Sequence, residues 1–106
     1  MSAFLLSSSG YGDCAAGYLC LWEHGNFAGR RLQFQAAALR NLTDFGFNDQ
    51  MSSWRNRRYG DARWYGDVNR GGPSLCMNGG AAAASIGPYN DTASSIQLYN
   101  SALACR

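Results

Sequence analysis

The sequence predicts an all-β sandwich or Greek-key domain, on three observations. Short stretches alternate apolar and polar residues, which is the period of a half-buried strand. Glycine-rich turns separate these stretches, and the chain has 13 glycines but only 2 prolines among its 106 residues. No stretch shows the longer apolar period of an amphipathic helix. A chain of this length forms one domain with a single core, near the lower limit of size for stability without further support.

The expected strands fall into two similar halves. The first half is predicted to hold strands at residues 18–23, 31–34 and 54–58. The second half is predicted to hold strands at residues 62–65, 74–77 and 96–99. Gly25 and Asn26 mark the first turn, and residues 36–39 are compatible with a single helical turn that is too short to be stable alone. Residues 79–84, rich in glycine and alanine, are expected to form a loop.

The two halves are an internal repeat. Trp22 aligns with Tyr65 and Asn26 with Asn69, in each case 43 residues later. The pattern Asn-Asp-x-x-Ser-Ser occurs at residues 48–53 and again 42 residues later. Each half therefore runs from an aromatic and glycine-containing hairpin to the same polar loop, which indicates two copies of one structural unit.

Each copy of the polar loop offers carboxylate, amide and hydroxyl oxygens within one turn of chain. Calcium is bound by six to eight such oxygens, together with backbone carbonyls. The alternative is a repeated Asx or Ser turn that binds nothing, because these residues also favour turns for purely local reasons. Two copies at a fixed spacing favour the metal site.

The chain has four cysteines, and an even number in a small domain favours two disulfides and an oxidising compartment. The spacing of the cysteines does not suit a zinc site, and the single histidine, His24, supplies no second ligand pair. Four cysteines allow three connectivities, which sequence alone does not distinguish. We expect a local Cys14–Cys20 bridge, which leaves Cys76 with Cys105.

The remaining features bound the class of protein. Residues 1–13 lack the charged and long apolar regions of a secretory signal, so we expect a flexible tail there and a single mature, secreted domain at residues 14–106. The net charge of +2 is too small to indicate a nucleic-acid or membrane partner. His24 has no nucleophile at a fixed spacing, and no pair of carboxylates is nominated for acid–base chemistry, so we expect a monomer that is not an enzyme.

Two motifs carry a resemblance to known families. The spacing Trp22-x4-Phe27-x-Gly29 resembles the Greek-key signature of the βγ-crystallins, and the two Asn-Asp-x-x-Ser-Ser loops resemble the double-clamp calcium motif of their microbial members. The second half departs from this signature at Arg70, where an aromatic residue is expected. Residues 14–20 also resemble the start of the actinobacterial peptidase-inhibitor family related to the Streptomyces metalloproteinase inhibitor, although no reactive loop is recognisable.

The βγ-crystallin resemblance implies a sandwich of two Greek-key motifs, at about residues 18–58 and 62–100, with two calcium ions (Ca2+) at one end. In that family each ion is held by groups from both motifs; which loop serves which ion stays open here. Side-chain oxygens are expected from Asp49, Ser52, Asp91 and Ser94. Backbone carbonyls are expected from Glu23, Gln50, Gly66 and Thr92, with Asp67 as an alternative to Gly66. The aromatic and apolar residues expected in the core or at corners are Trp22, Phe27, Trp54, Tyr65 and Ile96.

Two functional hypotheses follow. The first is a secreted calcium-binding βγ-crystallin domain whose fold calcium stabilises. The second is a protein inhibitor of a secreted peptidase, in which a rigid, disulfide-held segment occupies the active site. They are not mutually exclusive, and the second rests on family and fold analogy.

Overall fold

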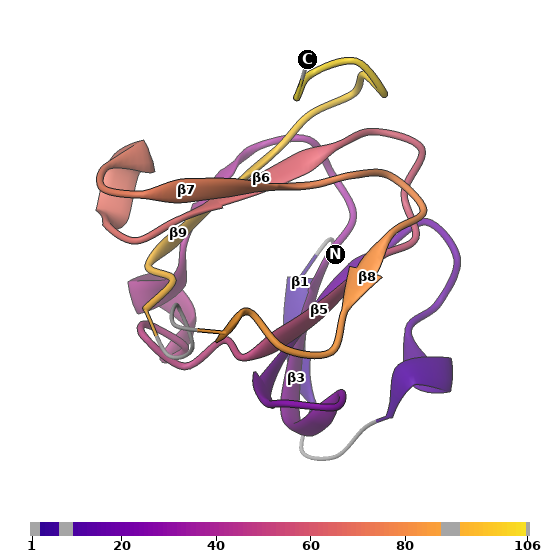
Figure 1. Cartoon of the computed structure of the whole chain (residues 1–106), viewed down its shortest axis with the longest axis vertical. Coiled ribbons are helices and arrows are strands. Elements are labelled where there is room, and N and C mark those ends of the chain that lie inside the picture. Colours follow the sequence, from indigo (N-terminus) through magenta and orange to yellow (C-terminus); the bar gives the residue numbers. More distant parts are fainter. Residues whose placement is uncertain (1–2, 7–9, 88–91, 106) are drawn as a thin grey trace.

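The computed structural model describes residues 3–6, 10–87 and 92–105, and their strands form two antiparallel sheets packed face to face (Figure 1). The strands are β1 (Ala3–Leu6), β2 (Leu19–His24), β3 (Ala28–Phe34), β4 (Leu39–Asn41), β5 (Ser53–Asn56), β6 (Ala62–Tyr65), β7 (Ser74–Met77), β8 (Ala82–Ala83) and β9 (Ser95–Leu98). Three short 3-10 turns complete the described elements, namely η1 (Tyr11–Asp13), η2 (Leu42–Phe45) and η3 (Val68–Arg70).

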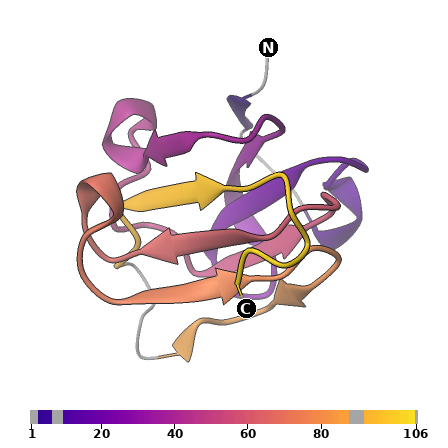
Figure 2. The same cartoon turned by 90° about the horizontal axis from the view of Figure 1, so that it is seen from above.

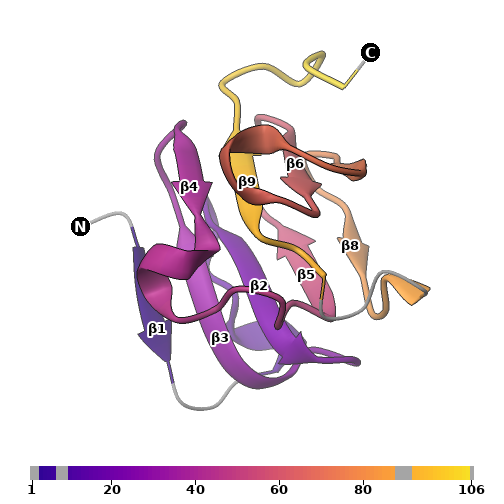
Figure 3. The ribbon, with the colours of Figure 1, turned by 90° about the vertical axis from the view of Figure 1, so that its left-hand side faces the viewer.

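The two halves of the chain exchange strands between the sheets. One sheet has the order β1-β3-β2-β5-β8 and the other the order β4-β9-β6-β7. Strand β4 belongs to the first half but pairs with β9 of the second, and β8 of the second half pairs with β5 of the first. Figure 3 shows this exchange, with β4 beside β9 and β8 beside β5. The predicted all-β sandwich of two Greek-key motifs is thereby confirmed.

Three strands differ from the sequence-based expectations, and all three lie at sheet edges. Strand β1 pairs with β3 at residues that were expected to belong to a flexible tail. Strand β4 forms at the end of the expected helical turn, and β8 lies inside the expected glycine- and alanine-rich loop. Alanine favours helix or loop by intrinsic propensity. Here the backbone hydrogen bonds offered by a neighbouring strand decide the conformation.

The main core lies between the sheets and takes residues from both. Leu19 and Leu21 of β2 face it, whereas the intervening Cys20 and the following Trp22 point to the opposite side, as the two-residue period of a strand requires. The buried residues of this core include Leu32, Phe34, Trp54, Ala62, Trp64, Met77, Ile96 and Leu98. Of the residues expected in the core or at corners, Trp54 and Ile96 belong to this core, whereas Tyr65 is half-buried beside the buried Trp64.

A second, smaller cluster covers the outer side of β2. Cys14, Cys20 and Trp22 are fully buried there and pack against Tyr18 and Phe27. The rings of Trp22 and Phe27 meet edge to face, with their centroids 5.2 Å apart. The segment that precedes β2 therefore packs against the outer side of this strand.

The two disulfides join the pairs expected from the sequence. Cys14–Cys20 has a Cα–Cα distance of 6.0 Å and closes the short segment over β2. Cys76–Cys105 has the same Cα–Cα distance and ties the C-terminal segment to β7, 29 residues earlier. In Figure 2 this segment crosses over the sheet formed by β9, β6 and β7. Within the described residues, no helix has the length and apolar character needed to cross a membrane.

Candidate metal site

The first polar loop lies against the first hairpin, and its counterpart lies in the same way against the second. The backbone amide of Ser52 donates to the carbonyl of Trp22, and that of Ser94 donates to the carbonyl of Tyr65, each at 2.8 Å. Trp22 and Tyr65 are the residues that the internal repeat aligns. Ser52 and Ser94, the predicted hydroxyl ligands, are therefore bonded to the residues that immediately precede Glu23 and Gly66. Glu23 and Gly66 are the positions predicted to supply a carbonyl.

The two polar loops also contact each other. The hydroxyl of Ser94 donates to Oδ1 of Asp49 at 3.0 Å, although the two residues are 45 positions apart. The backbone amide of Asp49 donates to the carbonyl of Ala93 at 2.9 Å. Nδ2 of Asn48 approaches the second carboxylate oxygen of Asp49 at 3.2 Å. Two predicted side-chain ligands, one from each motif, thus lie within reach of a single ion.

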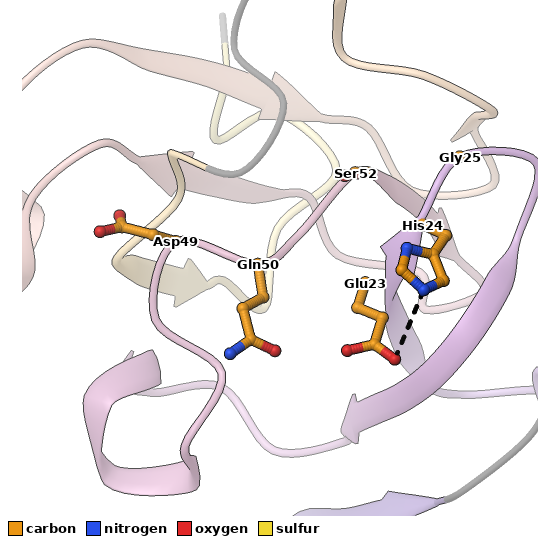
Figure 4. A pocket seen from close by; sticks show the side chains of 6 residues that line it. All are labelled: Glu23, His24, Gly25, Asp49, Gln50 and Ser52. Atoms are coloured by element: carbon orange, nitrogen blue, oxygen red, sulfur yellow. Dashed lines mark ion pairs between the residues drawn. The ribbon is translucent and has the colours of Figure 1, made fainter.

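A shallow pocket of about 280 Å³ opens between the first loop and the first hairpin. It is lined by Glu23, His24, Gly25, Asp49, Gln50 and Ser52 (Figure 4). In this view the Asp49 side chain points away from Glu23 and His24, whereas Gln50 and Glu23 extend to the same side. The hydrogen bond from Ser94 places the Asp49 carboxylate beside the second motif. Four of the predicted ligands therefore border one opening at this end of the sandwich.

The carboxylate of Glu23 is engaged by an arginine of the neighbouring strand. The backbone amide and Nε of Arg30 donate to its two oxygens, each at 3.0 Å. These contacts lower the pKa of the Glu23 carboxyl below its ordinary value, and the hydrogen bond from the backbone amide of Arg30 contributes most. Burial of the carboxyl acts in the opposite direction. Arg30 also donates through Nη2 to the side-chain oxygen of Gln50. No feature of the sequence marked Arg30 as part of the site.

The second hairpin is less crowded. Gly66 stands where the first hairpin has Glu23, and its amide donates to the carbonyl of Pro73 at 2.7 Å. The carbonyl of Asp67, the alternative ligand, accepts the hydroxyl of Ser95 at 2.5 Å, and its carboxylate accepts from the amide of Val68 at 3.3 Å. These contacts turn Asp67 toward its own hairpin. Of the predicted ligands on the second loop, Thr92 is half-buried and Asp91 lies outside the described residues.

The second serine of each pair has a different role from the first. The hydroxyl of Ser53 donates to the carbonyl of His24 at 2.7 Å and accepts from the amide of Phe27 at 3.1 Å. The hydroxyl of Ser95 makes the same two contacts in the second hairpin, with the carbonyl of Asp67 and, at 3.1 Å, the amide of Arg70. Both serines are fully buried. They fasten the hairpins to the strands rather than facing the pocket.

These contacts explain how the second hairpin keeps its shape without the signature aromatic. Asn26 and Phe27 have φ angles of 58° and 61°, and their counterparts Asn69 and Arg70 have φ angles of 54° and 65°. Left-handed backbone at two successive residues is unusual outside glycine. The hairpin conformation is therefore common to both halves, and the serine hydroxyl holds it at Arg70 as it does at Phe27.

A cluster of Asp61, Cys76 and Cys105 has its ligand-type atoms within 4.8 Å of one another. The two sulfurs are joined in a disulfide, which removes them as metal ligands. The buried carboxylate of Asp61 accepts from the amides of Gly79 and Cys105, at 2.9 and 3.3 Å. This group is therefore a structural anchor of the C-terminal segment and not a second metal site.

Solved structures with the same architecture are βγ-crystallin domains. A structure from work on the evolution of the eye lens βγ-crystallin domain fold has a TM-score of 0.78 at 21% identity, over 92% of this chain and 97% of that chain. A βγ-crystallin from Ciona intestinalis has a TM-score of 0.68 at 26% identity, over 78% and 100%. A βγ-crystallin domain from Flavobacterium johnsoniae has a TM-score of 0.66 at 26% identity, over 76% and 92%.

The family follows from the sequence itself. The chain belongs to peptidase inhibitor family I36, whose family model matches residues 7–77. No curated protein matches the chain. Both predicted resemblances are thus confirmed, and the expectation that the chain is not an enzyme agrees with a family of inhibitors on a crystallin-like fold.

Proposed function

We propose that this protein inhibits a secreted peptidase. Membership of peptidase inhibitor family I36 carries this proposal, because the matched residues 7–77 include the whole first motif and the start of the second. Two disulfides support an extracellular location and a rigid scaffold. A rigid chain loses little conformational entropy when it binds, which favours tight association with an enzyme.

Strand β7 supports this proposal as the segment that meets the enzyme. It is the edge strand of its sheet, so that one side of its backbone pairs with β6 and the other faces outward. Edge strands are commonly protected by charged residues. Strand β7 has none, and Leu75 is 46% exposed on it. An extended strand that is anchored by the Cys76–Cys105 disulfide has the form in which chains add to an exposed strand of a partner.

The test is a titration of purified secreted metallo- and serine peptidases with the protein. We expect stoichiometric, tight inhibition of at least one enzyme. Leu75→Asp should raise the inhibition constant at least tenfold. Leu103→Asp, at a residue that is 62% exposed outside any strand, is the matched control and should inhibit as the wild type does. No inhibition of any enzyme at large molar excess would remove the inhibitor function. Equal inhibition by both variants would exclude β7 as the segment that contacts the enzyme and would leave the inhibitor function in place.

We propose, as a second function, that the end of the sandwich with the two polar loops binds calcium. The hydrogen bond between Ser94 and Asp49 favours this function, because it brings a hydroxyl and a carboxylate from different motifs together. Asp49 is exposed, so that its carboxylate is accessible from solvent. The donor set consists of hard oxygens, which fit calcium better than a softer metal. The bound ion would cross-link the two motifs and so stabilise the fold.

The protein's own residues suggest how the ion would be held. Asp49, Ser52 and Ser94 supply side-chain oxygens, and Glu23, Gln50, Gly66 and Thr92 are the proposed sources of carbonyls. Asp91 is proposed for the second ion by the internal repeat. One carboxylate per ion implies modest affinity, roughly 10⁻⁶ to 10⁻⁴ M. Magnesium should compete poorly, because it requires compact octahedral geometry and releases its waters reluctantly.

Thermal unfolding in calcium and in chelator tests this second function. At a calcium concentration 100 times the dissociation constant, one site adds about 2.7 kcal/mol, which for this size of domain is a rise of roughly 10 °C in melting temperature. Asp49→Ala should lose most of that rise and keep the melting temperature in chelator. Asp44→Ala, at an exposed carboxylate of η2, is the matched control and should keep the rise. Identical wild-type curves in calcium and chelator would show that the loops are turns only.

A further inference from the structure

Arg30 lies in β3 and contacts two of the residues that line the pocket. Its amide and Nε hold both oxygens of Glu23, and its Nη2 holds the side-chain oxygen of Gln50. Glu23 and Gln50 both line the pocket. The guanidinium group thus holds one carboxylate oxygen of Glu23 and the side-chain oxygen of Gln50, so that neither of these oxygens is free to face a bound cation.

The two hairpins differ at this point although their backbones match. Gly29 and Gly72, with φ angles of 83° and 74°, are counterparts in the repeat. The next residue is Arg30 in the first hairpin and Pro73 in the second. Glu23 likewise corresponds to Gly66, so that at these two positions the second hairpin has neither a carboxylate nor a guanidinium. The pair formed by Glu23 and Arg30 is therefore an addition to the first hairpin alone.

The groups around Asp49 contrast with this pair. Its carboxylate accepts from the hydroxyl of Ser94 and approaches the amide group of Asn48, and both of these donors are neutral. Its negative charge stays available to a cation. At the first hairpin, in contrast, the charge of Glu23 is balanced by a guanidinium that carries a permanent positive charge.

We propose that Arg30 is a tethered cation that weakens calcium binding at the first hairpin and makes the two calcium sites unequal. This inference rests on the proposed calcium binding. An ion between Asp49 and Ser94 binds first, and an ion beside Glu23 and Ser52 binds only against the charge of Arg30. A unit positive charge several ångströms from a divalent ion, at high effective dielectric, corresponds to about a tenfold loss of affinity.

Three variants separate the effect of the Arg30 charge on calcium affinity from the effects of side-chain shape and of net charge. They are Arg30→Gln, Arg30→Lys and Arg63→Gln. Arg30→Gln removes the charge and frees one oxygen of the Glu23 carboxylate, while the backbone amide at position 30 keeps its bond to the other oxygen. Arg30→Lys keeps the charge with a different shape, so it controls for packing. Arg63→Gln makes the same change in charge on β6, where Arg63 donates to the hydroxyl of Ser74. Arg30 is about one third exposed, and we expect all three variants to fold, with circular dichroism and the melting temperature in chelator as the check.

Isothermal titration of chelator-treated protein with calcium chloride gives the readout. We expect two unequal binding steps in the wild type, with the weaker step tightened about tenfold by Arg30→Gln and unchanged by Arg30→Lys and Arg63→Gln. Binding seen only in Arg30→Gln would also support the inference. If the wild type binds calcium and Arg30→Gln has the same constants, or if Arg30→Lys tightens binding equally, the tethered cation is excluded while calcium binding stands. No heat from any variant would remove both proposals.

Discussion

Replacing Ser53 with alanine should destabilise the metal-free protein by about 2–4 kcal/mol. The Ser53 hydroxyl is buried and joins the carbonyl of His24 to the amide of Phe27, at 2.7 and 3.1 Å. Losing the hydroxyl leaves two backbone groups without this partner, and each costs about 1–2 kcal/mol, toward the lower end of the range for an unsatisfied buried group. The same estimate applies to Ser95→Ala in the second hairpin, where the two contacts are equivalent.

Urea and thermal unfolding in chelator measure this effect directly. For a domain of this size, 1 kcal/mol corresponds to roughly 4 °C, so each variant should melt about 8–16 °C below the wild type. Ser94→Ala is the matched control within the same pair of serines. It removes one partly buried hydrogen bond to Asp49 and should cost about 1 kcal/mol in chelator, but it should lose most of the stabilisation by calcium.

The two serines of each pair should therefore differ in when they affect stability. The second serine of each pair should affect stability with or without calcium, and the first should act mainly in its presence. If Ser53→Ala and Ser95→Ala melt within about 2 °C of the wild type in chelator, the hydroxyls do not hold the hairpins, and the assignment of separate roles fails.

Three further predictions concern stability. Arg58→Met should cost about 3 kcal/mol in urea unfolding, because its buried guanidinium, whose pKa burial lowers, donates to carbonyls of three separate segments; a cost below 1 kcal/mol would contradict this role. Arg70→Gly should raise stability by about 0.5–1 kcal/mol by relieving a φ of 65°. Phe27→Gly relieves a similar φ but should lower stability, since the Phe27 ring packs against two aromatic neighbours at 4.8 and 5.2 Å; equal shifts would show that this ring packing does not outweigh the relief of strain. The lowered pKa of Glu23 means that its stabilising contribution is complete above its unfolded value of about 4.5 and is lost as pH falls from there through the lower folded value. Arg30→Gln keeps the backbone hydrogen bond, which is the largest cause, and loses the guanidinium contacts, so its unfolding between pH 3 and 6 should show a slightly shallower acid decline.

The sequence predicts best where local pattern and tertiary environment agree. Strands β2, β6 and β7 were expected within a residue or so of their observed bounds, because alternation along them matches a buried and an exposed face. Strands β4 and β8 were missed because their alanine-rich surroundings carry no such alternation. Their conformation depends on a partner strand from the other half of the chain, which no local pattern records.

The candidate site shows the same division. The repeat located both polar loops, and the family resemblance supplied the expectation that groups from both motifs share an ion. The contact between Ser94 and Asp49 depends on how the two halves pack, which the repeat does not specify. The role of Arg30 was also beyond reach, because Arg30 and Arg31 are adjacent and only their position on β3 decides which of them meets Glu23.

The serine pairs also limit what the repeated motif can indicate by itself. The hydroxyls of Ser53 and Ser95 hold the two hairpins. The same fold would need them even in a related chain without a metal site. A double serine after Asn-Asp therefore signals the hairpin lock as much as a cation site. On the proposed calcium function, the groups that distinguish a metal-binding chain are the first serine and the aspartate, since Ser94 and Asp49 meet across the two motifs. A loop with the second serine but without those oxygens would fold in the same way, and calcium would leave its stability unchanged.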